Sequence, residues 1–312
     1  MLHDLGAEHP ESPDRLYAID DQLLASGMEM VCEHADAKPI SEAYLSLAHD
    51  PYYVKSVFER AKCVQNKPDD KTTPKVNTDK PKVAWLDDET GIMKHTLTAA
   101  LESAGAGCEG VDWVMQGDDR QAFCLTRPPG HHATYDSSMG FCLFNNIVIA
   151  ARYALQNYHL SRVAIIDFDV HHGNGTEHIV AGDQRIMMCS SFQHPFYPHS
   201  GAPVSASNIL AVPIDAGANG EVFREKVGHW FDALRNFQPQ LIFISAGFDA
   251  HTEDPMSHLR LVEDDYFWIS QHIRRIADSC CNGRIVSSLE GGYDLSSLGR
   301  SVVAHLKGLS HP

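Results

Sequence analysis

The stretch VAIIDFDVHHGNG, residues 163–175, decides the fold, because an apolar run ends there in a dense group of carboxylate and imidazole side chains. The run 163–167 is typical of a short buried strand. If the strand continues to about Val170, Asp167 and Asp169 point to one face and His171 follows on that face. Asp and His are suitable ligands for Zn²⁺ and similar ions. The stretch therefore predicts a strand that ends at a metal site.

Outward from this strand, short apolar runs alternate with amphipathic segments. Further strands are expected at 122–126, 185–190, 241–245 and 284–289, and helices at 12–26, 41–62, 90–104, 144–156, 220–236, 264–279 and 295–309. Strands that alternate with helices predict an α/β protein whose mostly parallel sheet is covered on both faces. No internal repeat and no second composition regime is found. We therefore expect a single domain over residues 1–312, with an exposed polar excursion at about 62–82.

Four polar motifs follow these strands almost directly. They are PPGHH (128–132), DFDVHH (167–172), GFD (247–249) and EGGY (290–293). The carboxyl ends of parallel strands share one edge of a sheet, where ligands bind, so the motifs should converge. Asp249 could then add a third ligand, and a site of two Asp and one His leaves room for a catalytic water. The alternative, that these side chains only cap helices, would be favoured for a single isolated motif.

The histidine pair and the tyrosine supply the other groups that hydrolysis needs. A Pro-Pro-Gly turn can present His131 and His132 together, and imidazoles transfer protons near neutral pH. Gly291 and Gly292 allow a sharp turn that brings Tyr293 back over the site, where a phenol can donate to a developing oxyanion. Taken alone, the pair could be an exposed loop and the tyrosine a core residue.

The composition narrows the class of protein further. The formal net charge of −16 predicts repulsion from nucleic acid and anionic membranes and attraction of cationic substrates. No apolar run is long enough to span a bilayer, and the N-terminus lacks the features of a signal peptide. The eight cysteines form no CxxC pair, so we expect reduced thiols and a cytoplasmic protein. Nineteen histidines, several of them clustered, point to metal chemistry.

In this order and at these separations, the four motifs resemble the histone deacetylase family. The forms PPGHHA, DFDVHHGNGT, SAGFDAH and EGGYDL are similar to its class II and bacterial members, and HPESPDRL (9–16) is similar to their opening motif. The resemblance covers nearly the whole chain and implies the arginase-deacetylase fold, a three-layer α/β/α sandwich. Relatives usually have a strand before residues 3–9, and we expect it here to be cut, absent or replaced.

The resemblance also implies a role for each site residue. Asp169, His171 and Asp249 would bind Zn²⁺, and Tyr293 matches the catalytic tyrosine of the family. Relatives that carry His at the position of Tyr293 are poor lysine deacetylases.

In the histidine pair, His132 would be the general base and acid, and His131 would act electrostatically. Asp167 would orient His131, and Asn174 would lie beside His132. Many relatives have Asp at the position of Asn174, so the pKa of His132 should be raised less here.

Two further sets of residues follow from the resemblance. A structural K⁺ would be bound by Asp167, Asp169, His171, Ser190 and Ser191. The substrate tunnel would be lined by Gly140, Phe141, Tyr197 and Met256, with Asp88 or its neighbour Asp87 as a carboxylate at the rim. Tyr197 stands where relatives often have Phe, and Arg15 matches an arginine below the site, near an exit path for acetate.

The implied function is a zinc-dependent deacetylase that hydrolyses the acetamide of acetyl-lysine or a related acetylated amine. A metal-activated water would attack, with a histidine as base and acid and the tyrosine as oxyanion donor. The alternatives are an acetylpolyamine amidohydrolase, an arginase-like hydrolase with two Mn²⁺ ions, and a non-catalytic acetyl-lysine binder. The metal count would identify the second, and loss of a site residue would be expected of the third. The resemblance also suggests a homo-oligomer, either a dimer or a tetramer.

Overall fold

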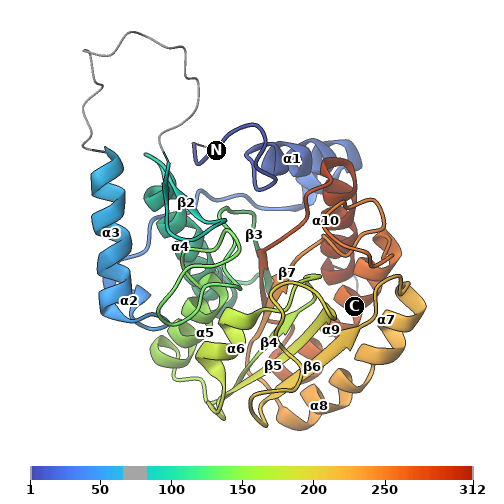
Figure 1. Ribbon diagram of the computed structural model, residues 1–312. Helices are drawn as coiled ribbons and strands as arrows, with labels where there is room; N and C mark the ends of the chain where they lie inside the picture. Colours follow the sequence, from blue (N-terminus) through green and yellow to red (C-terminus); the bar gives the residue numbers. More distant parts are fainter. Residues whose placement is uncertain (1, 66–82, 311–312) are drawn as a thin grey trace, which may run out of the picture.

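The computed structural model describes residues 2–65 and 83–310, and its centre is a six-stranded parallel sheet (Figure 1). The order of the strands across the sheet is β3-β8-β7-β4-β5-β6. Their bounds are β3 (Gln121–Cys124), β4 (Val163–Asp167), β5 (Ile186–Gln193), β6 (Ile209–Ile214), β7 (Ile242–Ala246) and β8 (Ile285–Leu289). A separate antiparallel pair, β1 (Ala84–Trp85) and β2 (Gly91–Ile92), lies beside it.

Helices cover both faces of the sheet because side chains alternate along each central strand. In β4, Ala164 and Ile166 pack into one apolar core, whereas Val163 and Ile165 pack into the other. The first core is closed by α1 (Asp14–Ser26), α7 (Gly220–Val227), α8 (His229–Phe237), α9 (Glu263–Cys281) and α10 (Leu295–Ser310). The second is closed by α2 (Glu42–Leu45), α3 (Pro51–Gln65), α4 (Thr96–Gln116), α5 (Asn146–Asn157) and α6 (Asn174–Val180). The chain thus has the expected three-layer α/β/α sandwich.

The N-terminal part departs from the expected helices in two places. The single helix expected at 41–62 is wrong, because two helices, α2 and α3, occupy this region and Pro51 begins the second. Proline lacks an N–H and suits only the first turn of a helix, so α2 cannot continue through it. The short 3₁₀ helix η1 (Met28–Val31) follows α1.

The helix expected at 90–104 begins later and is longer, because α4 runs from Thr96 to Gln116. Its second half contains glycines, which favour turns in an isolated sequence. In the fold they permit close packing. A Cβ on Gly105 would lie 1.9 Å from the Lys38 carbonyl oxygen, and one on Gly110 would lie 3.1 Å from Val286.

Three further elements differ from the expectation. The helix expected at 220–236 is divided at Gly228 into α7 and α8. The edge strand β6 and the short helix α6 were not expected.

Of the polar excursion at 62–82, residues 62–65 end α3 and residues 66–82 lie outside the described residues. Within the described parts of the chain, no helix is both long and apolar enough to cross a membrane.

The strand register brings the motif-bearing loops together at one edge of the sheet. Asp167, the last residue of β4, pairs with Ser190 of β5 and with Ser245 of β7. The loop after β8 follows Leu289, which pairs with Ala246 of β7. Because all six strands are parallel, the loops after β3, β4, β7 and β8 leave the sheet on the same side.

Candidate active site

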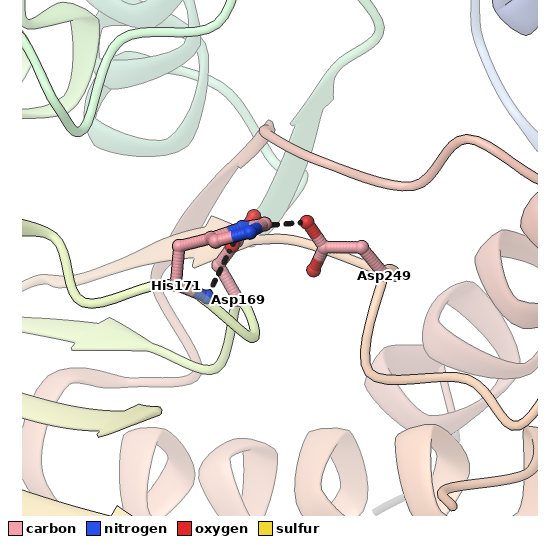
Figure 2. Close-up of side chains that lie close together, drawn as sticks. All are labelled: Asp169, His171 and Asp249. Atoms are coloured by element: carbon pink, nitrogen blue, oxygen red, sulfur yellow. Dashed lines mark hydrogen bonds and ion pairs between the residues drawn. The ribbon is translucent and has the colours of Figure 1, made fainter. Parts of the chain in front are cut away.

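Three buried side chains from two loops converge on one point at the carboxyl edge of the sheet. Asp169 and His171 follow β4, and Asp249 follows β7 (Figure 2). The Nδ1 atom of His171 lies 3.1 Å from Asp169 Oδ1 and 3.1 Å from Asp249 Oδ2. All three residues are buried, and the most exposed of them, His171, is only 8% exposed. The residues predicted as metal ligands are therefore adjacent in the fold.

The donor set fits a zinc ion. One ligand atom from each residue lies within 4.8 Å of the others, and the atoms are two carboxylate oxygens and one imidazole nitrogen. Zinc bonds of about 2.0–2.1 Å in tetrahedral geometry require ligand atoms about 3.3 Å apart, close to the distances around His171. A single imidazole nitrogen also cannot donate one proton fully to two carboxylates. Asp169, His171 and Asp249 could together hold Zn²⁺ and leave one position open.

Electrostatics favour a positive charge at the same point. Burial lowers the pKa of His171, but Asp249 and Asp169 outweigh it and raise this pKa to about 10. Burial and the charge of Asp169 raise the pKa of Asp249 to about 6. The two buried carboxylates therefore favour positive charge at this point, and a divalent cation would supply it in place of the His171 proton.

The two adjacent histidines each have a separate partner. His131 Nδ1 donates to Asp167 Oδ2 at 3.0 Å, and His132 Nδ1 donates to Asn174 Oδ1 at 2.7 Å. The ring centroids of the two histidines are 4.1 Å apart. Donation from Nδ1 leaves the Nε2 atom of a neutral His132 as a proton acceptor.

The two histidines also differ in charge. Burial lowers the pKa of His131, but Asp169, Asp167 and Glu290 outweigh it and hold this pKa well above its ordinary value. Burial and the neighbouring His131 and His171 hold the pKa of His132 well below its ordinary value. One ring is therefore cationic and the other neutral.

A narrow cavity of about 170 Å³ leads to these groups. Aromatic rings of Phe141, Phe196 and Tyr197 form its walls, and Met256 and Gly140 also line it. The remaining lining residues are Glu89, Pro129, His131, His132, His171, Gly291 and Tyr293. Gly140 has φ +52°, and a Cβ there would lie 2.4 Å from His132 Cδ2, so this position requires glycine.

Tyr293 lies in a turn between β8 and α10 that is held from both sides. Gly292 has φ +122°, which only glycine adopts readily. The buried Arg15 donates from Nε to the Gly292 carbonyl at 2.6 Å, and its guanidinium lies 5.0 Å from the centre of the Tyr293 ring. This backbone conformation places the tyrosine ring in the cavity lining.

The rim carboxylate is not the one expected. Asp88 is absent from the cavity lining, and Glu89 is present instead. Both oxygens of Asp87 have partners, because its Oδ1 accepts from the amides of Glu89 and Thr90 in its own loop and its Oδ2 accepts from Ser138 in another loop. Asp87 thereby fixes the loop that presents Glu89. Burial and then the neighbouring charge of Glu89 raise the pKa of the Tyr197 phenol.

Of the residues expected to bind K⁺, Asp169 and His171 belong to the Asp–His–Asp cluster, and Asp167, Ser190 and Ser191 lie in the adjacent strands β4 and β5. Ser190 and Ser191 are in β5 beside the end of β4, and both are buried. The hydroxyl of Ser190 has no hydrogen-bond partner among the described residues, which is unusual for a buried polar atom. The backbone placement of Asp167 next to Ser190 is compatible with a shared cation.

Sequence reasoning missed three side chains that hold the site together. Glu290 accepts from the amides of Gly130 and His131 at 2.7 and 3.1 Å, and it also accepts from Ser245. Asp254 accepts from the amide of Tyr293. Phe196 stacks on His171 with ring centroids 5.5 Å apart. Glu290 and Phe196 adjoin residues that the motifs singled out, whereas no pattern in the sequence marks Asp254.

Comparisons with known proteins identify the family. Residues 9–309 match the histone deacetylase domain. An uncharacterized protein of Synechocystis is 36% identical over 99% of this chain and 96% of its own length. A probable deacetylase of Methanothermobacter thermautotrophicus is 38% identical over 72% of this chain and 69% of its own.

Larger relatives and a solved structure show the same relationship. Type-2 histone deacetylase 1 of Dictyostelium discoideum is 30% identical over 97% of this chain, which spans only 28% of that protein. The crystal structure of the HDA15 HD domain superposes with a TM-score of 0.86 at 29% identity, over 99% of this chain and 84% of that one. The chain therefore belongs to the histone deacetylase family of hydrolases.

Proposed function

We propose that the protein is a zinc-dependent deacetylase that hydrolyses the acetamide of an acetylated cationic amine. The observation that carries this proposal is that His132, Tyr293 and His171, one member of the Asp–His–Asp cluster, line one aromatic-walled cavity. Such a cavity suits a straight methylene chain, which can pass between two rings, with the amide at its inner end.

The residues divide the reaction between them. Zn²⁺ held by Asp169, His171 and Asp249 would polarise the amide carbonyl and activate the attacking water. Nε2 of His132 would accept the proton of that water, since its Nδ1 donates to Asn174. The phenol of Tyr293 would donate a hydrogen bond to the oxyanion as it develops.

The leaving amine also requires a proton, because an alkylamine anion is too basic to depart. His132, protonated in the first step, would return its proton to the nitrogen. The cationic His131 donates from its Nδ1 to Asp167, so this nitrogen would take no part in the proton transfer. The positive charge of the ring would stabilise negative charge nearby.

A carboxylate in the cavity lining favours a cationic substrate. Glu89 lies in this lining, near enough to Tyr197 for its charge to raise the pKa of that phenol in addition to burial. Its carboxylate would attract an ammonium group or a substrate N–H. A structural K⁺ at Asp167 and Ser190 is part of the same proposal, supported by the unpartnered hydroxyl of Ser190.

A turnover assay on the purified protein tests the proposal. An acetyl-lysine peptide, N-acetylputrescine, N-acetylspermidine and a trifluoroacetyl-lysine reporter would be compared before chelation, after chelation and after zinc is restored. We expect cleavage that disappears on chelation and returns with one Zn²⁺ per chain, and the ratio of kcat/KM values would assign the substrate class. Failure to cleave any substrate with one zinc bound would contradict the proposal, and activity that requires two Mn²⁺ would favour the arginase-like alternative.

A further inference from the structure

The turn that carries Tyr293 is bound through its backbone by one buried carboxylate. Oδ2 of Asp254 accepts from the amide of Tyr293 at 2.6 Å and from the amide of Asp294 at 3.1 Å. Asp254 is only 5% exposed. It lies in the loop after β7, five residues beyond Asp249, whereas Tyr293 follows β8. The side chain therefore joins two loops that are distant in sequence.

The second oxygen of the same carboxylate fixes the wall of the cavity. Oδ1 of Asp254 accepts from the amide of Met256 at 2.9 Å, and Met256 lines the cavity together with His132 and Tyr293. One carboxylate thus sets the position of the tyrosine turn relative to a wall of the cavity. Three backbone N–H groups donate to the two oxygens of Asp254, so this position requires a side chain that only accepts. An asparagine here would place its NH₂ group, a donor, against one of these N–H donors.

We propose that Asp254 is a positioning residue for the reaction, acting through the hydroxyl of Tyr293. This inference rests on the proposed function, in which that hydroxyl stabilises the oxyanion. Displacing the turn by a fraction of an ångström would leave Tyr293 present but poorly aimed. Since misplacement by about 1 Å can lower a rate by about 10²-fold, Asp254→Asn should lower kcat by about tenfold to a hundredfold. The loss should not exceed the loss caused by Tyr293→Phe.

A double-mutant cycle separates positioning from a general structural effect. Asp254→Asn, Tyr293→Phe and the double variant would be compared for kcat and KM, with zinc content and Tm measured on each. If Asp254 acts through the phenol, Asp254→Asn lowers kcat in the parent protein and has almost no further effect in the Tyr293→Phe background. Zinc should remain at the parent content, and KM should change less than kcat.

Asp265→Asn is the matched control. Asp265 is 3% exposed and caps the start of α9 by accepting from the Val262 amide at 2.9 Å and from Arg224 at 2.9 Å. Among the described residues, its side-chain hydrogen bonds and ion pair are with Arg224 and Val262, and neither is a site residue. Its replacement should lower Tm, and any change in kcat should be the same fold in both backgrounds.

Two outcomes would overturn the inference and are distinguishable. An equal fold-loss from Asp254→Asn with and without the phenol, or no loss at all, would overturn the positioning role and leave the proposed function intact. Full activity in Tyr293→Phe would instead overturn the oxyanion role in the proposed function, and this inference with it. If Asp254→Asn does not fold, Asp254→Glu keeps the charge and both acceptors while moving them by one methylene. The same non-additive loss is then expected from Asp254→Glu, and an additive loss would overturn the role.

Discussion

At the scale of single residues, neighbouring histidines acquire opposite properties from their partners. His131 faces the carboxylates of Asp167 and Asp169, whereas His132 faces the amide of Asn174 and two other imidazoles. Burial disfavours the charged form of both rings, and only His131 has enough negative charge nearby to overcome it. A cationic ring therefore lies beside a neutral ring that can accept a proton. The side chain at residue 174 is therefore one of the groups that set the pKa of His132, the proton acceptor.

Replacing Asn174 by Asp tests this control. A carboxylate beside Nδ1 would favour the imidazolium form, so the pKa of His132 should rise. A base must be deprotonated to act, and the acidic limb of kcat/KM should therefore move to higher pH. Profiles of kcat/KM against pH for the parent and for Asn174→Asp would show the shift. A limb that stays in place, or moves to lower pH, would contradict the assignment of His132 as the base.

Removing the hydroxyl of Tyr293 is the second test at this scale. Tyr293→Phe keeps the ring that lies 6.0 Å from Phe141 but deletes the donor. Loss of one oxyanion donor lowers kcat by about 10²–10³-fold, or about 2.7–4 kcal/mol of transition-state stabilisation. Steady-state kinetics on an acetyl-lysine substrate would measure it, with zinc content as the control for an intact metal site.

At the scale of elements, the site depends on parallel strands whose ends coincide. The loop after β4 supplies Asp169 and His171, the loop after β7 supplies Asp249, and the adjacent register of these strands brings the loops together. Hydrogen bonds across loops complete the arrangement, because Asp249 Oδ1 accepts from the Val170 amide at 2.9 Å. Binding of a metal therefore requires both strands to be in place.

Metal retention should depend on the ligand from β7. Asp249→Ala leaves only two of the three protein ligands that a catalytic zinc site needs, so the purified variant should lack stoichiometric zinc. Metal analysis of the purified protein measures this directly. Asp215→Ala, an exposed carboxylate, is the matched control and should retain the parent content. One zinc per chain in Asp249→Ala would contradict the ligand assignment.

The contact between α10 and the sheet makes stability depend on pH. His305 is fully buried, with Nδ1 2.7 Å from Ser270 Oγ and Nε2 2.9 Å from Ser287 Oγ, and burial lowers its pKa to about 3. As the pH falls below about 6.5, the unfolded chain takes up a proton at this position and the folded chain does not. Stability should therefore decrease on acidification, by about 1.4 kcal/mol per pH unit for this residue, until the pH nears 3.

His305→Gln tests the sign of this dependence. The variant cannot titrate at residue 305, so its free energy of unfolding should fall less steeply between pH 6 and 4.5 than that of the parent. Urea unfolding at several pH values gives both slopes. Equal slopes would show that His305 is not held neutral by burial.

At the scale of the whole molecule, the buried carboxylate of Glu11 links the N-terminal segment to the core. Glu11 is fully buried and pairs with Arg127 at the end of β3, with Arg15 at 3.3 Å and with His3 at 3.5 Å. Burial raises the pKa of Glu11, but the hydrogen bond with His3 and the charges of Arg127, His3 and Arg15 outweigh burial and lower the pKa well below its usual range. The same Arg15 binds the carbonyls of the Tyr293 turn, so this segment connects to the site.

Glu11→Ala should strongly destabilise the fold. It would leave the buried guanidinium groups of Arg15 and Arg127 without their counter-charge, which costs about 3–5 kcal/mol in comparable buried pairs. Thermal or urea unfolding would measure the loss. Glu8→Ala removes an exposed carboxylate from the same segment and should change stability by less than about 0.5 kcal/mol. A similar small effect for Glu11→Ala would contradict the proposed link.

The sequence by itself determined the class of fold and the groups that the site brings together. The continuous apolar run of β4, which is buried throughout, and the polar motifs directly after strands are local properties, and parallel strand ends must share an edge. These properties predict that the Asp–His–Asp cluster and the histidine pair lie at one edge of the sheet. Local preference is overridden in α4, which continues beyond the expected residue 104 through glycines that disfavour a helix but permit close approach to Lys38 and Val286.

Only the tertiary structure decided which side chains hold and aim those groups. Asp254, Glu290 and Glu11 act on backbone or side chains far away in the chain, and such pairings have no period or spacing in the sequence. Glu89 rather than Asp88 lines the cavity, and Oδ1 of Asp87 holds this loop in place by accepting from the amides of Glu89 and Thr90. The conformation of that loop has no signature in the sequence. Hydrophobic periodicity follows from the local conformation of the chain, whereas the partner of a buried charge depends on the complete packing.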